Sequence, residues 1–379
     1  MKKKYLIGLL FIIIISFSYG IFVGHYKIFP FNAISDTKFF LTNTKPEKSI
    51  HRPQIYENPN DVIKLIRIEN KDDITKKRQD LINYIWAGKD FPYSKMPNST
   101  QNNIDVPEFK DLKNLKRIDS FTTVMEYDMN SIAYLFLAEN SNNKLVVFHQ
   151  GHEGEDFSLD KDKIQFFLNH DYSVLIFAMV THGMNNEPIL NLPEFGTLRL
   201  NSHNHFKLIE STTFHPIKYF VEPIALSLNY IDKNYNFNKY YMVGLSGGGW
   251  TTVLYSALDE RISQSYPVAG SFPMYLRADS ANFGDYEQTL PDLYRIANYE
   301  ELYVMDSYGH DRKSVQIFNK SDPCCFPAEL YEEFPYGPTI KTKLSQLGEG
   351  TFDVIIDETA KKHEISQFAM NKILDSMNS

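Results

Sequence analysis

The sequence is poor in cysteine, because Cys324 and Cys325 are the only two in 379 residues and they are adjacent. Two neighbouring cysteines cannot build a disulfide framework. Their Cα atoms also lie closer together than those of an ordinary disulfide. We therefore do not expect a bridge, and we expect the fold to depend on a large hydrophobic core.

The body of the chain also lacks a basic cluster. The formal net charge is -8 at pH 7, with a pI near 5.8. Proteins that bind nucleic acid normally carry a basic patch, so no nucleic-acid partner is expected. Hydrophobic residues make up 43% and charged residues 23%, which is ordinary for a globular protein.

A long apolar run occurs at the N-terminus. Lys2, Lys3 and Lys4 are followed by no charged residue before Lys27. A run of about twenty apolar residues can cross a bilayer as a helix, and leading lysines stay on the cytoplasmic side. The pattern predicts that residues 1–26 anchor an exported protein to the membrane. A signal peptide, cleaved near the small residues around position 18–20, is the alternative and would give a secreted or periplasmic protein.

Three further regions follow. Residues 27–60 are polar and predict a stalk. Residues 61–115 predict an N-terminal helical extension, because apolar residues in "DDITKKRQDLINYIWAG" recur at helical spacing. Within it, "NSTQNNIDVPEF" (98–109) predicts a loop. Residues 116–379 form the main domain.

In the main domain, predicted strands alternate with predicted helices. The predicted strands are 118–127, 131–139, 144–149, 173–183, 239–246, 262–272, 314–322 and 352–358. The predicted helices are 160–171, 216–235, 247–260 and 363–377, the second with a kink at Pro223. This order predicts an α/β fold with a mostly parallel central sheet covered by helices on both faces. The long connections 181–215 and 270–312 are predicted to form lids or pocket walls.

One serine lies at a special point of this pattern. Ser246 sits between a predicted strand and a predicted helix, in the sequence Gly244-Leu245-Ser246-Gly247-Gly248. A sharp strand-to-helix turn leaves no room for side chains two residues before and after the serine, and both positions are glycine. This is the Gly-x-Ser-x-Gly nucleophile elbow. The simpler interpretation is a glycine-rich surface turn.

A serine nucleophile needs a base, and the base needs an orienting acid. Asp322 follows the strand "SVQIF", and His363 follows the last strand, so both emerge at the carboxyl edge of the sheet. We predict Asp322 as the acid and His363 as the base. Alternatively, Asp322 only forms the turn before Pro323 and His363 caps a helix. Asp306 competes as the acid, but it precedes its strand and should lie at the opposite edge.

An acyl-transfer site also needs two donors for the oxyanion. The backbone N–H of Gly247 is one candidate. The loop His149–Gly154 offers the other, with the N–H of His152 favoured over that of Gly151. The side chains of His149, Gln150 and Glu153 are expected to brace this loop.

His203 and His205 are candidate metal ligands. No Asp, Glu or Cys stands at helical spacing from this pair, so neither a metal nor a cofactor is expected.

The stretches "FHQGHEG", "GLSGGGW", "SDPCCF" and "KKHEIS" together resemble the α/β-hydrolase superfamily of serine esterases, lipases and peptidases, over residues 116–378. The resemblance implies a Ser-His-Asp triad and an acyl-enzyme. Residues 40–115 resemble the N-terminal extension of some bacterial carbohydrate esterases.

The expected substrate is an acyl ester of a small molecule or glycan outside the cytoplasm, such as an O-acetylated glycan. This expectation rests on location and fold analogy. A peptidase or amidase with the same triad is one alternative. An inactive α/β-hydrolase fold that serves as a binding protein is the other.

Overall fold

The computed structural model describes residues 16–20, 23, 59–152, 156–277 and 283–379. Residues 1–53 and 54–379 form separate units, so the body described below is the second unit. In the first, residues 16–20 and 23 are helical. None of the helices in the described ranges is long and apolar enough to cross a membrane. Most of the predicted anchor (1–26) and stalk (27–60) lies outside the described residues.

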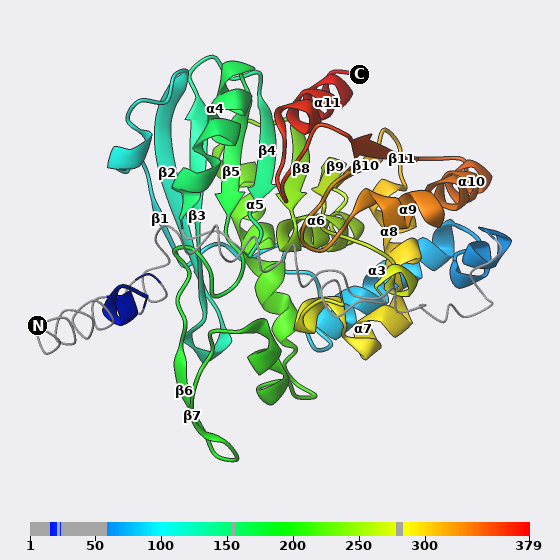
Figure 1. Cartoon of the computed structure of the whole chain (residues 1–379), viewed down its shortest axis with the longest axis horizontal. Helices are drawn as coiled ribbons and strands as arrows, with labels where there is room; N and C mark the ends of the chain where they lie inside the picture. Colours follow the sequence, from blue (N-terminus) through cyan, green and yellow to red (C-terminus); the bar gives the residue numbers. More distant parts are fainter. Residues whose placement is uncertain (1–15, 21–22, 24–58, 153–155, 278–282) are drawn as a thin grey trace, which may run out of the picture. The chain divides into compact units, whose positions relative to one another are not determined.

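The body is built on a nine-stranded sheet in the order β1-β2-β3-β5-β4-β8-β9-β10-β11 (Figure 1). The strands from β5 to β11 in this order pair in parallel, whereas β1, β2 and β3 pair antiparallel at one side. Their bounds are β1 Ser99–Gln101, β2 Leu115–Val124, β3 Asn130–Ala138, β4 Lys144–His149, β5 Ser173–Phe177, β8 Lys239–Leu245, β9 Ile262–Val268, β10 Lys313–Asn319 and β11 Thr351–Asp357. The predicted mostly parallel sheet is confirmed.

Helices cover both faces of the sheet. Successive side chains of a strand point to opposite faces. On β8, the Tyr240 hydroxyl donates to Asp232 of α5 (Glu222–Asn234), whereas the hydroxyl of Tyr241 donates to the Met377 carbonyl of α11 (Gln367–Met377) at 3.3 Å. Thus α5 and α11 lie on opposite sides. The α-helices are α3 Lys71–Ile85, α4 Lys161–Asn169, α5 Glu222–Asn234, α6 Gly247–Leu258, α7 Pro291–Ile296, α8 Tyr299–Ser307, α9 Ala328–Glu333, α10 Gly337–Leu347 and α11 Gln367–Met377.

The central strands are buried along their length, which explains their uninterrupted apolar sequences. Every residue of β5 is buried, as are all residues of β4 after Lys144. A strand covered on both faces has no polar side to present to water. The core therefore lies on both sides of β4, β5 and β8.

The two long connections contain structure of their own. The first holds the hairpin β6 Ile189–Leu192 and β7 Gly196–Arg199, followed by the 3-10 helix η6 His203–Leu208. The second holds η8 Met274–Leu276, η9 Tyr286–Gln288, α7 and α8. The remaining 3-10 helices are η2 Pro59–Leu65, η3 Pro107–Phe109, η4 Glu126–Asp128, η5 Phe157–Asp160 and η7 Pro216–Phe220.

Three sequence predictions need correction. The stretch 98–109 is not only a loop, because β1 pairs with β2 and η3 follows it. The predicted helix 216–235 is divided into η7 and α5; Pro223 lies in the first turn of α5, where a missing N–H costs no helical hydrogen bond. The last helix begins at Gln367 with Ser366 as its N-cap, so His363 lies in the preceding loop.

The predicted helix of the N-terminal extension is confirmed as α3. Asn70 forms a capping box with Asp73, and the apolar residues of the helix include the buried Ile74 and Leu81. Just before it, Arg67 pairs with Glu301 of α8 at 2.7 Å, and the Glu301 side chain is fully buried. The boundary at residue 115 stays a prediction.

Candidate active site

Ser246 is held in an unusual backbone conformation at the junction of β8 and α6. Its φ is 57° and its ψ is -123°. Positive φ is uncommon outside glycine and costs on the order of 1–3 kcal/mol, so the surrounding structure must impose it. The amide of Ser246 donates to the Val268 carbonyl at 2.9 Å, and its carbonyl accepts from Trp250 at 3.0 Å. Both hydrogen bonds fix the turn.

The glycines around Ser246 are required by close backbone approach. A Cβ on Gly244 would lie 2.2 Å from the Gly248 carbonyl oxygen. A Cβ on Gly248 would lie 2.2 Å from the carbonyl oxygen of His149. No side chain fits at either position, as the sequence predicted for a sharp elbow. A flexible surface turn would not impose such contacts.

Asp322 and His363 meet at the carboxyl edge of the sheet. The Nδ1 atom of His363 lies 2.8 Å from Asp322 Oδ2, and both side chains are largely buried. Burial raises the pKa of Asp322, but the hydrogen bond and the charge of His363 outweigh it, and the net pKa is lowered. The backbone N–H of Cys324 also donates to this carboxylate at 2.8 Å. The carboxylate is therefore ionised and aimed at the imidazole.

The loop that carries His363 is held by Asn319, the last residue of β10. Its Nδ2 donates to the carbonyls of Lys362 at 3.0 Å and Glu364 at 2.9 Å. These hydrogen bonds flank His363 on both sides. Sequence reasoning missed Asn319, although its place at the end of a strand could have indicated a role at this edge.

Asp306 lies apart from this pair. It accepts from the hydroxyls of Ser307 and Ser314 at 2.9 Å and from that of Ser265 at 3.2 Å. Ser314 is the second residue of β10, whereas Asp322 follows the end of that strand. Burial raises the pKa of Asp306 to about 7. The structure therefore places Asp306 at the amino end of β10, as predicted.

The loop after β4 lies against the Ser246 turn. A Cβ on Gly151 would lie 2.8 Å from Ser246 Cβ, and one on Gly247 would lie 2.5 Å from His152 Cε1. Gly247 opens α6, so its N–H has no intrahelical acceptor. Gln150 braces the loop by donating to the Asp156 carbonyl at 3.0 Å. Glu153 lies outside the described residues.

The expectation for the cysteines was wrong, because Cys324 and Cys325 form a vicinal disulfide. The loop between Asp322 and α9 brings the two sulfurs together despite the short Cα separation of 3.7 Å. The bridge lies in the segment that also presents Asp322.

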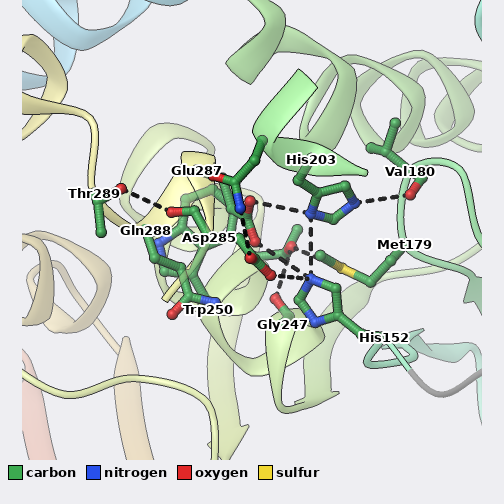
Figure 2. A network of polar contacts seen from close by, with 12 residues as sticks. His152, Met179, Val180, His203, Gly247, Trp250, Asp285, Glu287, Gln288 and Thr289 are labelled. Atoms are coloured by element: carbon green, nitrogen blue, oxygen red, sulfur yellow. Dashed lines mark hydrogen bonds and ion pairs between the residues drawn. The ribbon is translucent and has the colours of Figure 1, made fainter. Parts of the chain in front are cut away.

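The two candidate metal ligands, His203 and His205, have different neighbours in the structure. His205 contacts the Arg199 carbonyl through Nδ1 at 3.1 Å. His203 instead meets His152, Asp285 and Glu287 beside Gly247 (Figure 2). Sequence reasoning missed this cluster, since its members lie in three distant loops.

The sequence matches no known family model and no curated protein. Solved structures nevertheless resemble it. An acetyl xylan esterase from Paenibacillus sp. R4 has a TM-score of 0.52 and 12% identity, covering 84% of this chain and 98% of that one. Acetyl xylan esterase 1 from Thermoanaerobacterium sp. JW/SL YS485 has a TM-score of 0.50 and 10% identity, covering 84% and 97%. The methylesterase BT1017 has a TM-score of 0.51 and 11% identity, covering 85% and 65%. The chain has the α/β-hydrolase fold.

Proposed function

We propose that this protein is a serine hydrolase that cleaves an acyl ester, a carboxylesterase in the broad sense. The observation that carries the proposal is the strained Ser246 turn, with glycines where no Cβ fits. A backbone strain of this kind persists when function requires the hydroxyl to be presented above the sheet. The Asp322–His363 hydrogen bond supplies the base and its orienting acid.

In the proposed reaction, Ser246 Oγ attacks the ester carbonyl while His363 Nε2 takes its proton. The Nδ1–H of His363 donates to Asp322, which fixes the tautomer and stabilises the imidazolium. Within the described residues, buried His363 Nε2 has no hydrogen-bond partner. Collapse of the tetrahedral intermediate releases the alcohol with that proton. Water then attacks the acyl-enzyme and gives a proton to Nε2. Collapse of the second tetrahedral intermediate breaks the bond to Ser246 Oγ, which takes that proton from Nε2 as the acid leaves.

The oxyanion would be bound by two backbone donors. The N–H of Gly247 lies in the first turn of α6, where the helix dipole favours negative charge. The second donor is the N–H of His152, with that of Gly151 as the alternative. The approach of Gly151 to Ser246 and of the His152 ring to Gly247 supports this assignment.

The substrate class is an acyl ester of a small molecule or a glycan, and an O-acetylated glycan is the first to test. The N-terminal sequence, with its lysines and apolar run, supports action outside the cytoplasm. Residues 1–26 would serve there as an anchor or as a cleaved signal peptide.

A substrate panel tests this function. The protein is assayed on p-nitrophenyl esters of rising chain length, on an O-acetylated oligosaccharide and on peptide anilides, with Ser246→Ala as the matched control. Ester turnover that is lost in the variant supports the proposal. Faster turnover of anilides would favour a peptidase. Absence of turnover on every substrate, by a folded protein that no serine-reactive phosphonate labels, would favour an inactive binding protein.

A further inference from the structure

Four ligand-type side chains converge beside the Ser246 turn, from three segments far apart in the sequence (Figure 2). His152 follows β4, His203 begins η6, and Asp285 and Glu287 belong to the stretch around η9. One atom from each lies within 4.8 Å of all the others. The side chains of His203 and Glu287 are almost fully buried, whereas His152 and Asp285 are partly exposed.

Four separations within the cluster are close to those between ligands of one metal ion. His152 Nε2 lies 3.2 Å from His203 Nδ1 and 3.4 Å from Asp285 Oδ2. It lies 3.5 Å from Glu287 Oε1, and His203 Nδ1 lies 3.1 Å from Glu287 Oε2. Ligands about 2.0–2.1 Å from a tetrahedral zinc ion are about 3.3–3.4 Å from one another.

The contact with Val180 fixes which nitrogen of His203 faces the cluster. His203 Nε2 lies 2.9 Å from the Val180 carbonyl, which can only accept, so this nitrogen carries the hydrogen. The other nitrogen, Nδ1, faces Glu287 Oε2 and His152 Nε2, so it is the atom that can bind a metal ion at the centre of the cluster.

A second observation points to the same place. Glu287 Oε1 is buried and, in the part of the chain that the structure describes, has no hydrogen-bond partner. A buried carboxylate oxygen left unsatisfied costs free energy, so it normally has a hydrogen-bond donor or a cation beside it. His152 Nε2, which belongs to the same cluster, lies 3.5 Å from this oxygen.

We propose that His152, His203, Asp285 and Glu287 bind a divalent transition-metal ion, with Zn²⁺ the best fit. Two imidazoles and two carboxylates are ligands that zinc accepts in four-coordinate sites. Two carboxylate charges also balance one divalent cation, which makes burial of the charged group less costly.

The neighbours of the four ligands fit the same role. The Val180 carbonyl fixes the His203 ring, as partners of metal-bound histidines commonly do. The second oxygen of Asp285, Oδ1, accepts from Asn204 Nδ2 at 3.2 Å. The backbone carbonyl of Asp285 accepts from Thr289 at 2.9 Å. Each contact orients a ligand without occupying the atom that faces the centre.

The metal would join the loop after β4 to both long connections. The His152 ring lies against Gly247, so a metal ion bound to His152 would fix the loop that offers the second oxyanion donor. This positioning effect rests on the proposed esterase function, whereas metal binding itself does not. The ion is a structural clamp in this scheme and takes no part in the acyl transfer.

The test uses protein that a chelator has freed of metal. One sample is titrated with Co²⁺ and the visible spectrum is recorded. A second sample is titrated with Zn²⁺ in a calorimeter. One equivalent of each ion should bind, and Co²⁺ should show the intense bands of tetrahedral coordination. The apparent Tm should rise with added Zn²⁺, because a ligand that binds only the folded state stabilises it. Glu287→Gln should abolish the tetrahedral spectrum and the rise in Tm.

His205→Gln is the matched control, because it changes a histidine two residues from His203 that lies outside the cluster, and it should bind as the wild type does. If Glu287→Gln fails to fold, His152→Asn, with a partly exposed side chain, gives the same readout. The proposal would be overturned if the wild-type protein binds no ion, or if a folded Glu287→Gln or His152→Asn protein still binds one equivalent. The four side chains would then interact only with one another. If the protein binds the metal but a fluorophosphonate does not label Ser246, the proposed metal site stands and the proposed hydrolase function is refuted.

Discussion

His363 Nδ1 lies 2.8 Å from Asp322 Oδ2, across the ends of two neighbouring parallel strands. Asp322 follows β10 and His363 follows β11, so the register of one strand pair sets the distance between them. Since a carboxylate only accepts, the ring must donate its Nδ1–H. The other nitrogen, Nε2, is thereby left to accept a proton.

Asp322→Asn is expected to lower ester turnover by about 10⁴-fold, because an amide favours the wrong imidazole tautomer and stabilises the imidazolium less. Asp306→Asn should leave turnover close to that of the wild type, since Asp306 contacts serine hydroxyls at the opposite end of β10. The measurement is kcat/KM on one p-nitrophenyl ester for both variants with matched melting curves. The reverse ranking would refute the assignment of the acid.

Asp306 should make stability depend on pH. Its pKa is raised by burial from 3.8 to about 7, so between these values the folded protein holds a proton that the unfolded chain has released. Stability from this group is therefore full below about pH 4 and is lost as pH rises through about 7. Asp306→Asn removes this titrating group. The difference in Tm, variant minus wild type, should therefore increase by several degrees between pH 4 and pH 8. A constant difference in Tm across this range would contradict the buried, protonated carboxyl.

Gly248→Ala should destabilise the protein and abolish activity. The new Cβ would lie 2.2 Å from the His149 carbonyl oxygen, which belongs to the backbone of the central strand β4 and cannot move away cheaply. Overpacking of this kind typically costs about 1–3 kcal/mol or more. Ser246→Ala is the matched control and should lose activity with little change in Tm. A Gly248→Ala protein with wild-type Tm and turnover would show that the turn is flexible.

Asn319→Ala should lower kcat by about 10–100-fold with a smaller effect on KM, because misplacing a reacting group by about 1 Å can cost this much. The variant loses the two hydrogen bonds that flank His363. If Asn319 only stabilised the fold, Tm would fall while kcat at low temperature stayed unchanged. Steady-state kinetics below the melting range distinguish the two roles.

The elbow and the order of strands could be predicted because each depends on a local signal. The apolar runs before Ser246 and Asp322 define strands, and parallel strands deliver the residues after them to one edge. Ser246 itself is marked by its glycines. These signals lie within about ten residues of the groups they place.

The cluster of His152, His203, Asp285 and Glu287 could not be predicted in the same way. Its members come from loops without periodicity, and the two histidines are separated from the carboxylates by about eighty residues or more. The strand β1 was missed because it is three residues long and polar, with its place fixed only by pairing to β2. The vicinal disulfide depends on a loop conformation that composition does not specify.

The most direct test of the proposed function is labelling by a fluorophosphonate, followed by mass spectrometry of the modified peptide. The reagent reacts with a serine whose hydroxyl is activated by a neighbouring base. The account predicts one phosphonyl group per chain on Ser246, absent in Ser246→Ala and strongly slowed in Asp322→Asn. Labelling at another residue, or equal labelling of a correctly folded Ser246→Ala protein, would contradict it.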